Sequence, residues 1–254
     1  MADATAHCYT KPVGRAPVNV ARIESHPDKL FFVKWFRAFG RDFPWRKRGT
    51  SPYKILVTEM LLRQTRASNV CSIWDSFLDH YPNVRVLSSA KRGRLVKQLR
   101  VLGFGNQRAE ALVLASSWII QNHNGKVPSS LDQLLKIPHI GEYSARAILC
   151  FAHGKKFEIV DSNVLRFFSR YYGLNLNADN RRNRIAWQIA RETLPRTGKL
   201  AKEHNYGLLD FTAEICKSEK PVCEKCPLAK RCKWVLKQVQ TPGAAANSRQ
   251  VPVP

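Results

Sequence analysis

The sequence predicts an all-α protein. Apolar residues recur at helical spacing along most of its 254 residues, and an apolar content of 44% is enough to build a proper core. No run predicts a sheet, although residues 157–160 are short, apolar and extended in character. Glycine and proline fall between the periodic segments, where they end helices. The length fits one large domain or two small ones.

The helices can be placed in order from these breaks. The first begins at Pro27, a favourable first-turn position, and stops at Gly40. Phe43, Pro44 and Trp45 then form an aromatic turn that we expect to belong to the core. The predicted helices cover residues 27–39, 53–64, 69–80, 91–102, 107–122, 131–137, 142–153, 162–172, 181–193 and 201–216.

Both ends of the chain lack this periodicity. Residues 1–26 are expected to be a flexible arm, and residues 237–254, rich in Pro, Gly and Ala, a disordered tail. The N-terminus lacks the charged-then-apolar order of a signal peptide, and no segment reaches the ~18 apolar residues of a membrane span. We therefore expect an intracellular protein, in the cytoplasm or on the nucleoid, with no membrane partner.

Four cysteines near the C-terminus form a compact pattern, Cys-x6-Cys-x2-Cys-x5-Cys. They are Cys216, Cys223, Cys226 and Cys232. Thiolates so close together predict a metal centre, either a tetrahedral zinc ion or a 4Fe–4S cluster. Zinc ribbons usually carry two separated Cys-x2-Cys pairs, whereas a single pair flanked by lone cysteines favours the 4Fe–4S cluster. Among the other cysteines, Cys150 follows an apolar run and is expected in the core.

The chain is strongly basic. Its 42 Lys and Arg residues outnumber 19 Asp and Glu, which gives a formal charge of +23. An excess of this size indicates a polyanionic partner, and DNA or RNA is the usual one. The alternatives are a solvated surface, or an anionic membrane, for which no long basic amphipathic helix is present. Basic residues also run through the cysteine segment, at Lys217, Lys220, Lys225, Lys230, Arg231 and Lys233.

Residues 131–153 predict two helices joined by the tight turn Pro138-His139-Ile140-Gly141. Such a hairpin directs backbone N–H groups and a positive helix end outward, where they can hold a DNA phosphate whatever the base sequence. Taken alone, the pattern is common in helical proteins. Asp161 opens the next helix, and at that position an Asp is usually only an N-cap.

Taken together, the sequence resembles the helix-hairpin-helix DNA glycosylases of the endonuclease III superfamily, over about residues 28–235. The resemblance rests on the cysteine spacing, on the hairpin within residues 135–148 and on Val160-Asp161-Ser162-Asn163-Val164. It also includes Phe43-Pro44-Trp45-Arg46, Pro52-Tyr53 and residues 58–65.

The resemblance implies a two-domain all-α fold with a DNA cleft between the domains. A six-helix barrel that carries the helix-hairpin-helix would span residues 50–155, and an iron–sulfur cluster domain would combine residues 27–49 with residues 156–236. The family hairpin has Gly where this chain has His139. We expect this departure to strain the turn or to alter its grip on phosphate, without abolishing the hairpin.

The resemblance also implies the chemistry. Members that cleave the DNA strand carry a Lys where this chain has Tyr143, and a phenol cannot form a Schiff base, so a monofunctional glycosylase that uses water is implied. Asp161 would stabilise the oxocarbenium-like sugar and position the water. Glu59 would help the base to leave, which near neutral pH requires burial to raise its pKa.

An enzyme that acts on a stacked base must rotate the base out of the duplex and fill the gap. By resemblance, Gln64 is the residue that wedges into the duplex, and Phe104 lies in the loop that probes the base left behind. His139, Ile140 and Gly141 would form the part of the hairpin that holds the DNA backbone. The implied partner is double-stranded DNA with a mismatched or damaged base, bound by a monomer.

Three features favour thymine opposite guanine, and also uracil opposite guanine, over adenine opposite 8-oxoguanine. Few residues follow Cys232, whereas MutY-type adenine glycosylases carry a further C-terminal domain. The loop at residues 102–110 resembles that of the T:G mismatch enzymes. Asn205 is followed by Tyr206 rather than by the Gln of MutY-type enzymes. An adenine glycosylase, a lyase that uses Lys155 or Lys156, and a non-catalytic DNA-binding module remain as alternatives.

Overall fold

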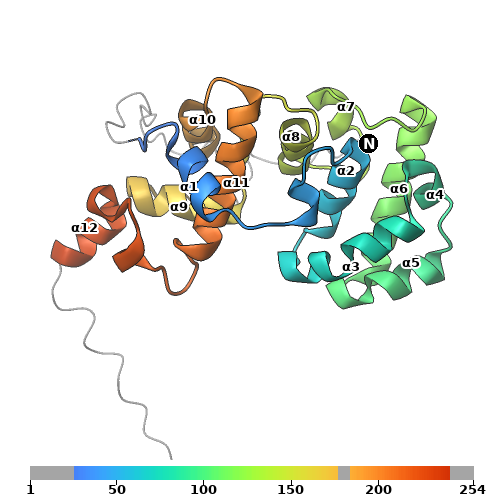
Figure 1. Ribbon diagram of the computed structural model, residues 1–254, viewed down its shortest axis with the longest axis horizontal. Coiled ribbons are helices and arrows are strands. Elements are labelled where there is room, and N and C mark those ends of the chain that lie inside the picture. The colour runs from blue at the N-terminus through green and yellow to red at the C-terminus, as the bar shows by residue number, and fades with distance from the viewer. Residues whose placement is uncertain (1–25, 177–183, 241–254) are drawn as a thin grey trace, which may run out of the picture.

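A computed structural model describes residues 26–176 and 184–240 (Figure 1). Within these ranges the chain is helical and contains no strand, which confirms the predicted fold class. Most of the predicted arm and the end of the predicted tail, residues 241–254, lie outside the described residues. In the described part, no helix combines the length and apolar character needed to cross a membrane.

The α-helices are α1 (Phe31–Phe39), α2 (Pro52–Leu61), α3 (Ala67–His80), α4 (Val84–Ser88), α5 (Arg92–Leu99), α6 (Gly105–His123), α7 (Leu131–Leu135), α8 (Glu142–Phe151), α9 (Ser162–Tyr172), α10 (Arg184–Thr193), α11 (Gly198–Glu214) and α12 (Lys233–Gln240). Short 3-10 helices span Pro44–Arg46, Arg100–Leu102, Cys223–Lys225 and Ala229–Arg231.

Two of these helices were not predicted. Helix α4 is only five residues long, too short for periodicity to reveal, and begins where the Asn83 side chain accepts a hydrogen bond from the Val86 N–H. Helix α12 directly follows the last cysteine and reaches Gln240, so the prediction that a disordered tail begins at residue 237 was wrong for residues 237–240. The Arg170 guanidinium packs over Trp234 of α12, 5.2 Å from the centre of the Trp234 ring.

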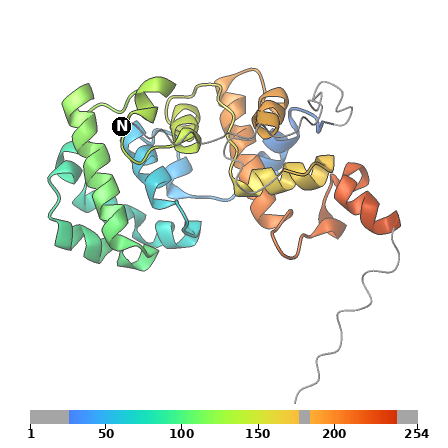
Figure 2. The same cartoon turned by 180° about the vertical axis from the view of Figure 1, so that it is seen from behind.

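The core divides into two hydrophobic clusters. The larger is built mainly from α2 to α8, and the smaller from α1, α9, α10 and α11. Figures 1 and 2 show these two groups of helices side by side, with α1 returned to the group formed by the C-terminal half of the chain. Hence residues from both halves of the sequence meet where the groups adjoin.

Helices α1 and α11 pack closely enough to require a glycine. A Cβ at Gly207 would lie 2.0 Å from the carbonyl oxygen of Phe32, so only glycine fits this crossing. The Phe32 ring packs edge-on against Phe211 and Phe167, with ring centres 5.6 and 5.7 Å apart. This aromatic packing fixes α11, which carries one wall of the site described next.

Candidate active site

A pocket of about 780 Å³ lies where the two groups of helices adjoin. It brings together four residues that the sequence singled out: Glu59, Gln64, Tyr143 and Asp161. Glu59 lies on α2, Gln64 in the loop that follows it, Tyr143 in the first turn of α8, and Asp161 at the start of α9. The fold therefore collects on one surface side chains that are far apart in the sequence.

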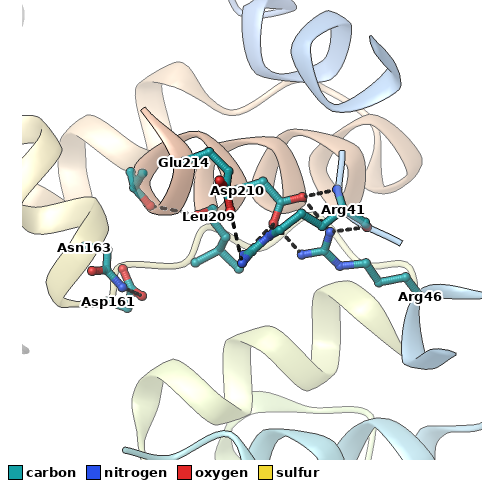
Figure 3. A network of polar contacts seen from close by, with 8 residues as sticks. Arg41, Arg46, Asp161, Asn163, Leu209, Asp210 and Glu214 are labelled. Carbon is teal, nitrogen blue, oxygen red and sulfur yellow. Dashed lines mark hydrogen bonds and ion pairs between the residues drawn. The ribbon is translucent and has the colours of Figure 1, made fainter. Parts of the chain in front are cut away.

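Asp161 is the N-cap of α9. Its Oδ1 accepts a hydrogen bond from the Val164 N–H at 2.7 Å. Its Oδ2 accepts one from the Asn163 amide at 3.0 Å, and Figure 3 shows Asp161 and Asn163 together. The capping role expected for an Asp at a helix start is thus confirmed. Because Asp161 is only half-buried and lines the pocket, the same carboxylate is also available to a ligand.

Glu59 is buried on α2, and its carboxyl makes no hydrogen bond to another described residue. Burial raises the pKa of Glu59 to about 8, and the negative charge of Asp161 acts in the same direction, against the opposing effect of Arg46. Burial and the nearby Glu59 and Asp161 also raise the pKa of Tyr143 well above its usual range. At neutral pH the pocket therefore holds a protonated Glu59 beside a neutral phenol.

A buried network of arginines and one carboxylate supports the pocket wall (Figure 3). Asp210 of α11 is fully buried and accepts hydrogen bonds from the side chains of Arg41 and Arg46 at 2.7 to 2.9 Å. The Arg41 backbone N–H also donates to Asp210, at 2.9 Å, and Arg46 donates to the Arg41 carbonyl. The network ties the segment after α1 to α11.

Aromatic rings enclose the Arg46 guanidinium. It lies 4.3 Å from the ring centre of Tyr206 and 4.9 Å from that of Phe43, and the Phe43 ring stacks on Trp45. Tyr206 in turn stacks on Phe151, with centres 4.2 Å apart. Arg46 Nε and the Tyr206 hydroxyl are buried without a hydrogen-bond partner among the described residues.

The aromatic turn after α1 has a second role that the sequence did not reveal. Trp45 belongs to the core as expected, but Phe43 and Trp45 both line the pocket as well. Arg46 belongs to the motif Phe43-Pro44-Trp45-Arg46. Its ion pair with Asp210 could not be predicted, because the two residues are far apart in the sequence. The pocket therefore has a flat aromatic wall, whereas the two unpaired polar atoms are buried and do not reach its surface.

A second cavity of about 320 Å³ adjoins the first through Gln64, which lines both. Its lining includes Phe104 and His139, two more of the residues expected to contact DNA. The remaining lining residues are Met60, Arg63, Gln107, Arg108, Glu110 and Ala111. Phe104 is 61% exposed, so it is not the core aromatic that its residue type alone would suggest.

Ile140 and Gly141 lie apart from both cavities. The Ile140 side chain is buried in the core, and its N–H donates to the Ile137 carbonyl at 3.1 Å, so this N–H is engaged within the turn. Gly141 is exposed as the N-cap of α8, with open space where a Cβ would lie. Of the three predicted hairpin contacts, Ile140 anchors the turn and Gly141 presents its backbone to solvent.

Three of the residues expected to contact DNA have a left-handed backbone. Gln64, Phe104 and His139 have φ angles of 52°, 54° and 64°. This region disfavours side chains because Cβ approaches the following carbonyl oxygen. The strain that we expected at His139 is thus present, and two further residues beside it share it.

Arg108 fixes the loops of the second cavity through hydrogen bonds, a role that the sequence did not predict. From α6, its guanidinium donates to the Gly103 carbonyl at 2.8 Å, the Leu61 carbonyl at 3.1 Å and the Arg63 carbonyl at 2.6 Å. It also bonds the Thr65 hydroxyl. One buried cation therefore fixes the loop that carries Gln64 and the loop that carries Phe104.

The four clustered cysteines line one small cavity with apolar walls, in the loops between α11 and α12. Arg170 borders it and donates to the sulfur of Cys216 at 3.7 Å and to the carbonyl of Lys217. Within residues 26–176 and 184–240, no three Cys, His, Asp or Glu side chains converge closely enough to hold a single metal ion. Cys150 is fully buried in the core, as expected.

The chain is similar to known DNA repair proteins. Residues 57–192 match the family described as HhH-GPD superfamily base excision DNA repair protein. A thymine/uracil-DNA glycosylase of Methanothermobacter thermautotrophicus is 39% identical over 78% of this chain and 88% of its own length. An adenine DNA glycosylase of Mycobacterium tuberculosis is 32% identical over 82% of this chain and 68% of its own length.

The fold is likewise similar to a solved one. The structure of a thermostable thymine-DNA glycosylase superimposes with a TM-score of 0.75 at 36% identity, covering 81% of this chain and 94% of that one. The match of sequence and fold is sufficient to place the protein. The chain belongs to the HhH-GPD superfamily of base excision DNA repair proteins.

Proposed function

We propose that this protein is a monofunctional DNA glycosylase that removes thymine or uracil mispaired with guanine and leaves an abasic site. One observation carries the proposal: the pocket holds the buried Glu59 carboxyl and the capped carboxylate of Asp161 on one surface, with Tyr143 beside them. Relatives named thymine/uracil-DNA glycosylases are 37 to 39% identical to this chain over 78% of its length.

Each group has a distinct task in such a reaction. Glu59 stays protonated up to about pH 8, so it can give a proton to the departing base near neutral pH. The Asp161 carboxylate, fixed by its helix-capping bonds, stabilises positive charge on the sugar and orients the attacking water. The aromatic wall around Arg46 offers the base a flat surface on which to stack.

The absence of a nearby amine supports hydrolysis without strand cleavage. Among the described residues, no lysine lines the pocket. The Lys155 ammonium donates to the Ser129 carbonyl, and neither Lys155 nor Lys156 borders the pocket. A Schiff base with the sugar therefore has no donor here, because the phenol of Tyr143 cannot form one.

Adenine is the second candidate for the removed base. Adenine glycosylases are also relatives, but with lower identity, 32% against 39%. Tyr206, which lines the pocket, stands where the resemblance places a Gln in adenine glycosylases. These differences favour a pyrimidine.

The proposal includes a structural 4Fe–4S cluster held by Cys216, Cys223, Cys226 and Cys232. The four sulfurs share one cavity but are too dispersed for a single ion, and ligands of four different iron atoms lie farther apart than ligands of one ion. A bound cluster would shape the basic loop around it, which includes Lys217 and Lys225, for DNA phosphates. Base hydrolysis needs no redox step, so the cluster is assigned no part in the chemistry.

A panel of duplexes tests which base is removed. Single-turnover release of the free base is measured from duplexes that carry T:G, U:G, A:8-oxoguanine or A:G. The enzyme, which we propose acts as a monomer, is in excess over the duplex. Release of thymine and uracil alone supports the proposal. Release of adenine alone would show that the protein is an adenine glycosylase instead. No release from any duplex would indicate a DNA-binding module without catalytic activity.

A further inference from the structure

The second cavity is surrounded by strained residues from three separate loops. Gln64, Phe104 and His139 all have a left-handed backbone, and all three line this cavity. Non-glycine residues keep this conformation only where the surrounding structure enforces it, and such residues cluster at ligand sites. The remaining described example, Asn124, ends α6 outside the cavity and is of a type that tolerates the conformation.

Hydrogen bonds hold the three loops in place. Arg108 bonds the carbonyl groups of Gly103 and Arg63, next to Phe104 and Gln64. The Arg63 side chain then donates to the His139 carbonyl at 3.1 Å, which ties the hairpin to the loop after α2. The backbone of His139 is therefore fixed while its exposed side chain borders the cavity.

The groups around the cavity match the pairing edge of one base. Arg63, Gln64 and His139 offer hydrogen-bond donors, and the exposed Glu110 carboxylate offers an acceptor. Guanine without its partner displays an acceptor, O6, beside two N–H donors. Adenine displays a donor at the same place as O6, which would face the donors of this cavity.

We propose that His139, at the edge of the second cavity, donates a hydrogen bond to O6 of the guanine that stays in the duplex when its partner is extruded. This rests on the proposed function and deepens it, because it assigns recognition of the opposite base to a residue where the resembled family has glycine. The expectation from the sequence concerned only strain or an altered phosphate grip. Here the imidazole, rather than the turn alone, contributes to specificity.

The test measures binding with an Asp161→Asn background, so that no base is released. Both duplexes carry a tetrahydrofuran abasic analogue at the extruded position, because thymine would pair with 2-aminopurine. One has guanine opposite the analogue, and the second has 2-aminopurine, which lacks O6. His139→Gly removes the imidazole and suits the left-handed backbone. We expect roughly a 10-fold loss of affinity for the guanine duplex, less than about a 2-fold loss for the 2-aminopurine duplex, and an unchanged salt dependence.

Two further variants separate the effect of the imidazole from the effect of the backbone conformation. Asn124→Gly relieves a left-handed residue of similar φ, 48°, outside the cavity and should change neither affinity. His139→Asn tolerates the backbone and keeps a donor, so it should recover part of the lost affinity. Thermal unfolding of His139→Gly should occur at the same or a higher temperature, which excludes misfolding as the cause.

Equal losses on both duplexes, with a salt slope reduced by about one, would mean that His139 holds a phosphate and would overturn the proposal. No loss on either duplex would overturn it as well. The binding assay needs no turnover, so its outcome is separate from whether the wild-type protein releases thymine.

Discussion

Arg46 donates to both carboxylate oxygens of Asp210, from Nη1 at 2.7 Å and from Nη2 at 2.9 Å. Asp210 is fully buried on α11, while Arg46 is the last residue of the short helix Pro44–Arg46 in the aromatic turn. The pair therefore joins two distant parts of the chain behind the aromatic wall of the pocket. The position of that wall, and hence the fit of an extruded base, depends on this ion pair.

Removing the Asp210 carboxylate should destabilise the protein strongly. Asp210→Ala leaves the partly buried charges of Arg41 and Arg46 without their partner, and we expect the free energy of unfolding to fall by about 3–5 kcal/mol. Urea unfolding measures the change. Glu214→Ala is the matched control, because Glu214 is half exposed and 3.8 Å from Arg41, so its loss should be below ~1 kcal/mol. Equal effects of the two variants would contradict the assignment.

Asp161→Asn should separate catalysis from folding. Asparagine caps a helix about as well as aspartate, so the unfolding free energy should change by only a few tenths of a kcal/mol, whereas Asp161→Ala should lose ~1 kcal/mol with the cap. DNA binding should survive in both variants, and base release should collapse in both. Full turnover by Asp161→Asn would show that the carboxylate is not the catalytic group.

The Glu59 carboxyl should set the alkaline limit of activity. With a pKa of about 8 in the folded protein, Glu59 loses its proton as the pH rises through that value, and a reaction that needs this proton slows above it. Single-turnover rates measured across this pH range test the point. Glu59→Gln should react slowly at every pH, and its rate should not fall further above about pH 8. If the fall in rate stays unchanged in this variant, another group causes it.

The same group should make folding stability depend on pH. The folded state binds the proton more tightly than the unfolded chain, so the stabilisation is complete below the ordinary pKa of 4.5 and is lost as the pH rises through about 8. Urea unfolding at about pH 5 and about pH 9 measures the difference. Glu59→Gln should reduce that difference; if it stays the same, burial of Glu59 is not its source.

Replacement of one clustered cysteine should release the metal centre. Cys226→Ser should abolish the brown colour and lower the content from about four iron and four labile sulfide per chain, and DNA binding should weaken as the basic loop loses its shape. Cys71→Ser is the matched control, because Cys71 is exposed and lies outside this cavity. An unaltered spectrum for Cys226→Ser would contradict the ligand assignment.

Local signals in the sequence predicted most of the helices. Periodicity and breaks such as Gly40 located α1 to α3 and α5 to α11 approximately, because these helices bury one face and end at recognisable residues. Asp161 was expected as a cap and is one. Helix α4 was not predicted, because five residues are too few to show the 3.6-residue spacing of apolar side chains in a helix.

Long-range geometry was beyond the sequence. The Arg46–Asp210 pair and the bonds of Arg108 join residues that the chain separates widely, and a single sequence carries no record of which distant groups meet. Strain at His139 could be anticipated because the resemblance supplied the expected glycine. The left-handed backbone of Gln64 and Phe104 could not, since neither residue type favours it and the neighbouring bonds impose it.

The most direct test of the account is what remains of a T:G duplex after one turnover, with and without alkali. We predict that thymine is released in full and that the strand stays intact until alkali breaks it at the abasic site. Strand cleavage by the protein alone, with borohydride trapping a covalent adduct, would contradict hydrolysis at a pocket without lysine. An intact thymine base after prolonged incubation would contradict the proposed function itself.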